Sequence, residues 1–199
     1  MKLRYAPNSP FVRKVMVTAI ENGLDGKIEK IPTDINVESD LSDQNPLGKV
    51  PTLLLDDGTV LIESTLICAH LDDGKLIPRD AKARSAALQL QAYADGLCEA
   101  AINVSRERGR PEDIRWAAAE ARQRLKFERT MDLLEREAEA RLAGALDIGQ
   151  VALGCALGWV DLRLGDFEWR RTRPKLAKWY ADLSRRPSMA ATAPPAPKP

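Results

Sequence analysis

The chain has one histidine and three cysteines among its 199 residues, which limits the chemistry available to it. His70 lies in a predicted helix with no cysteine or second histidine at metal-ligand spacing, so neither a metal site nor a histidine base is expected. The cysteines Cys68, Cys98 and Cys155 are odd in number and widely spaced, each within an apolar helical pattern. This pattern argues against a disulfide framework and predicts small buried side chains in a reducing compartment.

Long apolar runs and an excess of charge are also missing. No run approaches the roughly 20 apolar residues of a membrane span. The start, Met1–Arg4, leads into proline and serine rather than the apolar core of a secretory signal. Thirty basic residues balance 29 acidic ones, so no strong field directs the chain to nucleic acid or to a membrane surface. We therefore expect a cytoplasmic protein with neither of these partners.

The residues that are present can fill a sizeable core, since 44% are hydrophobic, in one large domain or two small ones. The first third alternates between strand and helix patterns. Lys2–Ala6 predicts a strand, and Ser9 followed by Pro10 predicts the start of a helix. Lys27–Pro32 predicts a weak second strand, and residues 33–43 a loop with one irregular helical turn.

The stretch Gln44–Ser64, QNPLGKVPTLLLDDGTVLIES, is the most informative part of the sequence. Two short apolar runs around a DDG turn predict a β-hairpin. Pro51, directly before the first run, predicts a cis peptide bond that turns the N–H and C=O of Val50 outward, where an extended peptide would pair as an added strand. Ser64 is expected to cap the next helix and to leave N–H groups that favour a carboxylate. With the cation of Lys49, this stretch suits a small, charged, peptide-like ligand.

A break at Asp73–Arg79, which contains glycine and proline, separates this region from a helical remainder. The first long helix carries a heptad seam of mostly small residues: Ala83, Ala87, Leu90, Ala94, Leu97, Ala101 and Val104. Such a seam requires a second surface, either a partner chain or another helix of the same domain.

Further helices follow the seam. A second long helix is expected from about Glu112 to Arg141. Asp147 and Gln150 have the spacing of a capping box ahead of an apolar, buried helix over 151–160. The last clear helix is predicted over 174–183, and the Ala/Pro-rich segment 190–199 is interpreted as a tail without a packed role.

The motifs SPFVRKV and NPLGKVPTL, the DDG hairpin and the pair ES together resemble the cytosolic glutathione S-transferases, in particular bacterial members with an N-terminal serine. The resemblance extends over nearly the whole chain and is most specific in its first third. It implies a mixed α/β plus all-α architecture. A thioredoxin-like domain (β-α-β-α-β-β-α) would span residues 1–76, an all-helical domain 77–189 and the tail 190–199.

The resemblance also implies a function, that of a glutathione transferase. Glutathione would be the co-substrate, with no metal, and the enzyme would add its thiolate to a small electrophile. Ser9 would be the catalytic residue that stabilises the thiolate. The glutathione-binding residues would be Phe11, Lys49, Val50, Glu63 and Ser64, with Pro51 as the structural cis-proline. A homodimer is implied as well, because the family usually pairs through this first long helix and the opposite thioredoxin-like domain.

Several alternatives stay open at this stage. Ser9 can be a plain N-cap, and Lys49 a solvated loop lysine. Neither Ser9 nor Val12 is a cysteine, which argues against disulfide exchange at this loop. Phe11, Asn103 and Arg106 are the candidates for the second-substrate pocket. The same site can also serve peroxide reduction or isomerisation, or the fold can be a non-enzymatic binding module.

Overall fold

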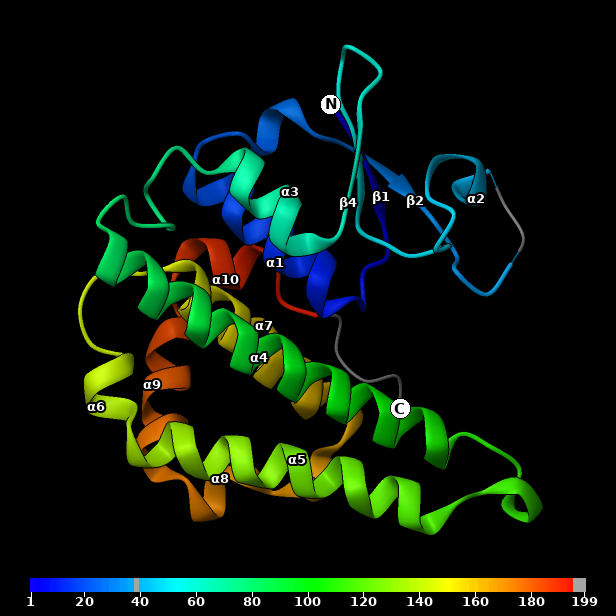
Figure 1. Cartoon of the computed structure of the whole chain (residues 1–199), viewed down its shortest axis with the longest axis vertical. Coiled ribbons are helices and arrows are strands. Elements are labelled where there is room, and N and C mark those ends of the chain that lie inside the picture. Colours follow the sequence, from blue (N-terminus) through cyan, green and yellow to red (C-terminus); the bar gives the residue numbers. More distant parts are fainter. Residues whose placement is uncertain (38–39, 195–199) are drawn as a thin grey trace.

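A computed structural model describes residues 1–37 and 40–194 of the chain. Its N-terminal part consists of β1 (Lys2–Tyr5), α1 (Pro10–Glu21), η1 (Asp25–Lys27), β2 (Glu29–Pro32), α2 (Leu41–Gln44), β3 (Thr52–Leu54), β4 (Val60–Ile62) and α3 (Ser64–Leu71). The strands form one sheet in the order β2-β1-β3-β4, in which β1 and β2 are parallel and the other pairs antiparallel. Helices α1 and α3 lie on one side of the strands and α2 on the other (Figure 1). The predicted thioredoxin-like order is therefore confirmed.

Local chemistry accounts for several of these boundaries. The Val50–Pro51 peptide bond is cis, as predicted, and β3 begins directly after it. The DDG turn joins β3 to β4, and Gly58 has a φ of +88°, a conformation that glycine adopts at little cost. The predicted helical turn within residues 33–43 is α2, which starts only at Leu41, and residues 38–39 lie outside the described part of the chain.

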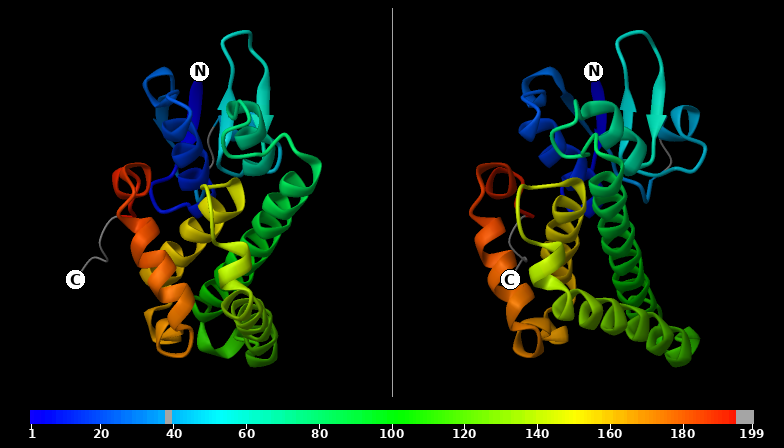
Figure 2. Two further views of the ribbon diagram at one scale, coloured as in Figure 1. Left: turned by 90° about the vertical axis from the view of Figure 1, so that its left-hand side faces the viewer. Right: turned by 60° about the vertical axis from the view of Figure 1, so that its left-hand side comes forward.

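The C-terminal part is all helical. It contains α4 (Ala81–Arg108), η2 (Glu112–Ile114), α5 (Ala117–Arg136), α6 (Ala138–Arg141), α7 (Ile148–Arg163), η3 (Gly165–Phe167), α8 (Trp169–Thr172), α9 (Pro174–Ser184) and α10 (Pro187–Ala191). Every residue of α7 from Ile148 to Val160 is buried, which confirms the predicted internal helix. Helix α7 packs on both α4 and α1, so it lies at the junction of the two parts (Figure 2).

The heptad seam of α4 is buried inside its own chain. From Ala87 to Val104 its residues belong to core clusters that also contain residues of α5 and α7, whereas Ala83 is exposed. The seam therefore has its second surface within the monomer and does not by itself require a partner chain.

The predicted helix from Glu112 to Arg141 is wrong as a single element. After η2, residues Arg115 and Trp116 are extended, and the Trp116 N–H donates to the Glu107 carboxylate at 2.7 Å instead of to a helical carbonyl. Helix α5 can therefore begin only at 117, and the chain is interrupted again at Glu137 before α6.

Two smaller predictions also need correction. Asp147 caps α7 by accepting the Gln150 N–H at 2.9 Å, but the Gln150 side chain donates to the Ala145 carbonyl, so it does not complete a capping box. The tail is packed at its start: α10 runs through residue 191 and Arg13 of α1 donates to Thr192 and to the Met189 carbonyl. Residues 195–199 lie outside the described part.

Candidate active site

The ends of three strands meet at one edge of the sheet. Thr52 of β3 is paired with Arg4 of β1 on one side and with Ile62 of β4 on the other. Both pairings are antiparallel, so the chain leaving β1, the chain entering β3 and the chain leaving β4 lie at the same end. The segments gathered there are the Ser9 loop, Val50–Pro51 and Glu63–Ser64.

Ser9 caps α1 at this edge. Its hydroxyl oxygen accepts the Val12 N–H at 3.3 Å, and its backbone is extended, as an N-cap requires. The predicted cap is therefore confirmed. A serine hydroxyl has one proton to donate, and no acceptor within the described residues takes it. The O–H of a partly buried serine at a helix N-terminus is thus available to an anion.

The loop before Pro51 is held by a buried asparagine. Asn45, 1% exposed, donates its amide to the Lys49 carbonyl at 2.9 Å and to the Thr52 hydroxyl at 3.0 Å, and accepts the Leu47 N–H at 3.0 Å. The Lys49 side chain is exposed. Neither the N–H nor the C=O of Val50 is bonded to any residue that the structure describes. This loop therefore presents an unpaired backbone edge next to a cation.

Glu63, and not Ser64, is the N-cap of α3. The Glu63 carboxylate accepts the Thr65 N–H at 2.9 Å and the Ser64 hydroxyl at 3.1 Å, so Ser64 becomes the first helical residue. Sequence reasoning chose Ser64 because serine is the commoner cap, whereas here the longer carboxylate reaches the N–H. Glu63 has a φ of 72°, a costly conformation for a side chain of this size that concentrates at functional sites.

A buried ion pair connects this edge to the helical part. Lys14 of α1 is 1% exposed, and its ammonium lies 2.8 and 2.7 Å from the two carboxylate oxygens of Asp95 on α4. One turn earlier on α4, Gln91 donates to the Thr65 hydroxyl at 3.0 Å. Desolvation raises the pKa of Asp95 most strongly, opposed by Lys14, while Glu63 and Glu99 also raise it. The negative charge of Glu63, the N-cap of α3, therefore acts on the Asp95 carboxylate across the junction.

A narrow crevice between α1, α4 and α7, too tight to admit a water molecule, lies beside this ion pair. It is lined by Pro10, Phe11, Lys14, Asp95, Cys98, Ala152, Cys155 and Ala156. Burial raises the pKa of Cys155 to about 11 and that of Cys98 well above its usual range, and away from the crevice that of Cys68 to about 12. These thiols stay protonated at neutral pH and are poor nucleophiles. A thiolate reacting at this edge must therefore come with a ligand.

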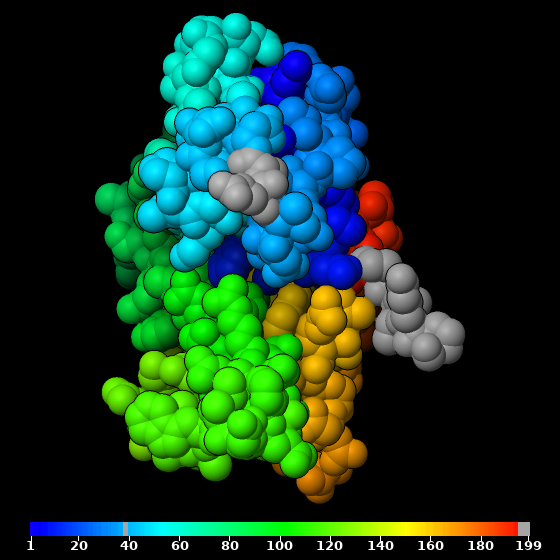
Figure 3. Space-filling view, turned by 90° about the vertical axis from the view of Figure 1, so that its right-hand side faces the viewer, coloured from blue at the N-terminus to red at the C-terminus, as the bar shows by residue number. Residues whose placement is uncertain are grey.

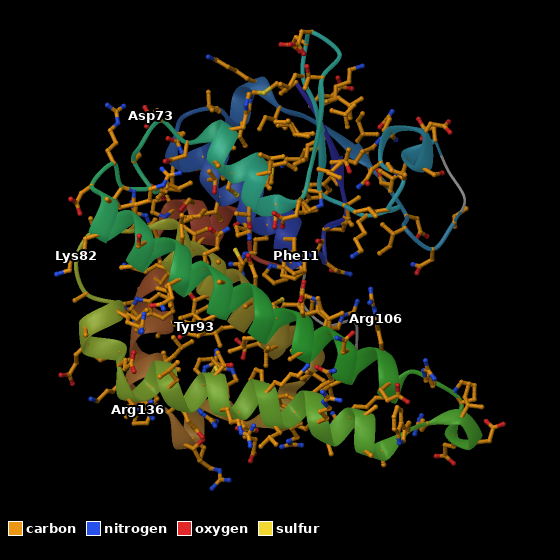
Figure 4. All side chains as sticks on the ribbon, viewed as in Figure 1. Phe11, Asp73, Lys82, Tyr93, Arg106 and Arg136 are labelled. Carbon is orange, nitrogen blue, oxygen red and sulfur yellow. The ribbon has the colours of Figure 1, made fainter. Side chains whose placement is uncertain are left out.

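Asn103 and Arg106, the two α4 residues proposed for the second-substrate pocket, lie at different angles around the helix axis. A helix turns about 100° per residue, so Arg106 lies about 20° around the axis from Asp95, and Asn103 about 80°. Figure 4 shows Arg106 on the side of α4 that faces the N-terminal part, where Phe11 also lies. Viewed from the right-hand side of Figure 1, the surface is hollowed between the N-terminal part and the green helices below it (Figure 3). Arg106 therefore lies on the side of α4 that faces the N-terminal part, and Asn103 is turned further away.

Within the described residues no group of histidine, cysteine and carboxylate side chains is arranged to hold a metal ion. Across those same residues, the helices are too short or too polar to span a bilayer.

Comparison with known families identifies this arrangement. Residues 8–73 match the glutathione S-transferase N-terminal domain, and residues 117–182 match the glutathione S-transferase C-terminal domain. The chain belongs to the glutathione S-transferase family. The family fold, a four-stranded mixed sheet with helices followed by a helical domain, is the architecture described above.

Individual glutathione S-transferase relatives cover almost the whole chain. An uncharacterized GST-like protein, YibF of Escherichia coli K12, is 31% identical over 98% of this chain and 99% of its own length. A glutathione transferase family member from Pseudomonas fluorescens Pf-5, crystallised with bound glutathione, is 41% identical, with a TM-score of 0.94 over 98% of this chain and 99% of that chain. A second structure of a family member from that strain, also 41% identical, contains S-(propanoic acid)-glutathione; it has a TM-score of 0.90 and covers 98% and 100% of the two chains.

Sequence reasoning missed three features of this glutathione S-transferase site. These are Asn45, the Lys14–Asp95 pair and the contact between Gln91 and Thr65. Asn45 stands in the quoted motif, and an asparagine before proline is a turn signal that points to local hydrogen bonding. The other two join residues 81 and 26 positions apart, and no local pattern reports such contacts.

Proposed function

We propose that this glutathione S-transferase family member binds glutathione, stabilises its thiolate and transfers it to a small electrophile. The observation that carries the proposal is the convergence of three groups at one sheet edge: the Ser9 hydroxyl, the unpaired Val50 backbone and the Glu63–Ser64 helix start. A tripeptide with a carboxylate at each end and one ammonium group requires this combination of groups.

Each part of glutathione has a chemical counterpart here. The Val50 N–H and C=O would pair with the cysteinyl backbone as an added strand. Lys49 would bind the glycine carboxylate, and Phe11 would pack beside the thiol. The free Ser64 N–H at the start of α3 would hold the γ-glutamyl carboxylate, the Ser64 hydroxyl would turn from Glu63 to the same carboxylate, and Glu63 would hold the ammonium. The crystal structures of the 41%-identical relatives contain glutathione and a thioether of glutathione, which supports this assignment.

Catalysis would consist of thiolate stabilisation and proximity. A free thiol has a pKa of about 8.5 and is only a few per cent ionised at neutral pH, so lowering the pKa by about one to two units is the main requirement. The Ser9 O–H and the N-terminal dipole of α1 would supply it. The thiol proton passes to solvent, and the sulfur lone pair then forms a bond to the electrophilic carbon.

The wider assignment follows from this activity. The electrophile would bind between Phe11 and α4, and detoxification would be its physiological context. We also propose a homodimer, because the thioredoxin-like part exposes the large apolar side chains Leu47 and Leu66, which are 63% and 51% accessible in the monomer. Three buried cysteines without disulfide bonds favour the cytoplasm.

The proposal is tested by calorimetry and turnover together. Glutathione is expected to bind at millimolar concentration or below, and Glu63→Gln and Ser64→Ala should each weaken binding by about 1–3 kcal/mol through loss of a charged hydrogen bond. Turnover of a model electrophile, measured beside hydroperoxide reduction and isomerisation, identifies the reaction. Absence of glutathione binding would refute the proposal, and binding without turnover would leave a binding module.

A further inference from the structure

We infer that the electrophile is a small apolar molecule carrying a carboxylate, and that Arg106 binds this carboxylate; this rests on the proposed transfer of glutathione. The inference depends on which side chains line one face of α4, from the Lys14–Asp95 pair at its inner end to the C-terminal end of the helix.

The inner end of this face offers no free cation among the described residues. Lys14 lies there, but its charge is already neutralised by Asp95. A carboxylate on the electrophile therefore has no partner at this end. Its other end, the reactive carbon, is therefore the part that approaches the Ser9 loop.

The middle of the face contains two apolar side chains. Phe11 of α1 and Ile102 of α4 are both partly buried and pack against the same helical-domain core. The apolar body of a small molecule would contact these two side chains. Burial of apolar area there contributes about 25 cal/mol for each Å².

The outer end carries a cation that no described residue pairs. Around the end of α4, Arg108 is paired with Glu120 and Asp166, Arg110 with Glu107 and Arg115 with Glu112. Arg106 makes no ion pair or side-chain hydrogen bond with any described residue. It is the exception in this group of neutralised arginines, and it lies on the side of α4 that faces the N-terminal part (Figure 4).

The spacing fits a single small molecule. Arg106 lies eight residues beyond Cys98, about 12 Å along the helix axis. Side chains on a helix lean toward its N-terminus, so the Arg106 guanidinium can lie over the turn that contains Ile102. A guanidinium also matches a carboxylate in shape and can bind it through two hydrogen bonds.

A matched pair of electrophiles tests the inference. Chlorodinitrobenzene and the corresponding chlorodinitrobenzoate, with its carboxylate opposite the reacting carbon, undergo the same substitution: the sulfur–carbon bond forms, and chloride leaves with the bonding electrons. We compare kcat/KM for the two at saturating glutathione, after subtracting the uncatalysed rates. The quantity compared is the kcat/KM for the benzoate divided by the kcat/KM for the benzene, taken within each variant. This ratio cancels differences between variants in folding and in thiolate formation.

In Arg106→Gln this ratio should fall about tenfold, mainly through KM of the benzoate. Arg106→Lys, which keeps the charge, should restore part of it. The matched control is Arg84→Gln, which removes an exposed arginine at the other end of α4 that forms no ion pair with a described residue. The control ratio should equal that of the parent, and added salt should lower the ratio in the parent but not in Arg106→Gln.

An unchanged ratio in Arg106→Gln overturns the inference. If glutathione binds but neither electrophile is turned over, the conjugation proposal fails. The inference is then tested by calorimetry with the two thioethers that glutathione forms with the benzoate and the benzene. If the ratio of their affinities is the same in the parent and in Arg106→Gln, the inference is overturned. If glutathione itself does not bind, the inference fails together with the function on which it rests.

Discussion

The Ser9 hydroxyl has one observed role and one proposed role, and a single substitution would remove both. Its oxygen accepts the Val12 N–H, which stabilises the start of α1, and its proton, which no described residue accepts, is proposed to bind the thiolate. An N-cap contributes about 1 kcal/mol to stability, and a hydrogen bond to a thiolate lowers the thiol pKa. Separation of the two roles requires measurements of both stability and thiol titration.

Ser9→Ala is expected to raise the thiol pKa of bound glutathione while leaving its affinity largely intact, because in the proposed complex the two charged ends of glutathione would supply most of the affinity. Each pKa unit lost should slow conjugation near neutral pH about tenfold. Thiolate absorbance against pH measures the effect. Ser9→Gly is the control, because glycine is a tolerable cap without the hydroxyl. If Ser9→Gly keeps the parental rate and titration, Ser9 is only a cap.

Glu21 stabilises the contact between α1 and α10. Its carboxylate is 8% exposed and accepts from Arg186 at 2.7 and 2.9 Å and from Ser188 at 2.5 Å. The Arg186 hydrogen bond is the main cause that lowers the pKa of Glu21 from 4.5 to about 2. Because the folded-state pKa is depressed, its contribution is fully present above about pH 4.5 and is lost as pH falls toward 2.

Glu21→Gln should therefore lower the free energy of unfolding by about 3 kcal/mol at pH 7. Urea unfolding at a series of pH values measures this, and the difference from the parent should shrink below pH 4.5. A difference that stays constant down to pH 3 would contradict the assignment to charge.

At the scale of elements, the close approach of α7 to α4 depends on glycine. A Cβ built on Gly149 would lie 2.6 Å from the Ala87 carbonyl oxygen and 2.6 Å from the Leu90 Cβ. Both obstacles are parts of a packed helix that cannot rotate away. The helices can therefore make this contact only because residue 149 has no side chain.

Gly149→Ala is expected to destabilise the protein by about 1–3 kcal/mol through overpacking. Thermal unfolding measures the change. Gly96→Ala is the control, because Gly96 is an exposed helical glycine of α4 with no atom within 4 Å of an added Cβ. That substitution should raise stability by about 1 kcal/mol, the usual helix preference for alanine. Equal changes in stability for the two substitutions would show that helix propensity, and not packing against α4, determines the effect of Gly149→Ala.

At the scale of the molecule, the two parts share a core and one buried ion pair. The core cluster of the thioredoxin-like part also contains Ile148 and Val151 of α7 and Met189 of α10. Lys14 and Asp95 lie across the same junction. Removal of one partner leaves the other charge buried without its counter-ion, which is costly, whereas replacement of both by apolar residues is much less so.

Lys14→Met should therefore lower stability by about 3 kcal/mol, and Lys14→Met with Asp95→Leu should recover a large part of the loss. A double-mutant cycle from chemical denaturation gives the coupling energy. Additive effects of the two single substitutions would show that the pair contributes no coupling across the junction.

The homodimer is tested by mass. Light scattering at micromolar concentration should give 44 kDa, twice the chain mass of 22.0 kDa. Leu66→Asp places a charge on the exposed face of α3 and should shift the mass toward the monomer. A parental mass near 22 kDa would refute the dimer.

Local sequence determined much of the N-terminal part. The strand and helix order, the cis-proline, the DDG hairpin and the Ser9 and Asp147 caps were all predicted correctly. Each depends on residues within a few positions of one another: a turn residue, a proline ring or a hydroxyl beside an N–H. Short-range chemistry of this kind can be predicted from a single sequence.

Tertiary structure decided what no local pattern contains. The seam of α4 is covered by α7, Lys14 meets Asp95 81 residues away, and the N–H of Trp116 is taken by Glu107, which ends one helix prediction. The same holds for Arg106: the sequence predicts that it lies on a helix, but only the packed structure shows that the neighbouring Arg108 and Arg110 have ion-pair partners while no described residue pairs with Arg106. A side chain's charge and shape are fixed by the sequence, whereas its partners depend on which distant residues the packed core brings within reach.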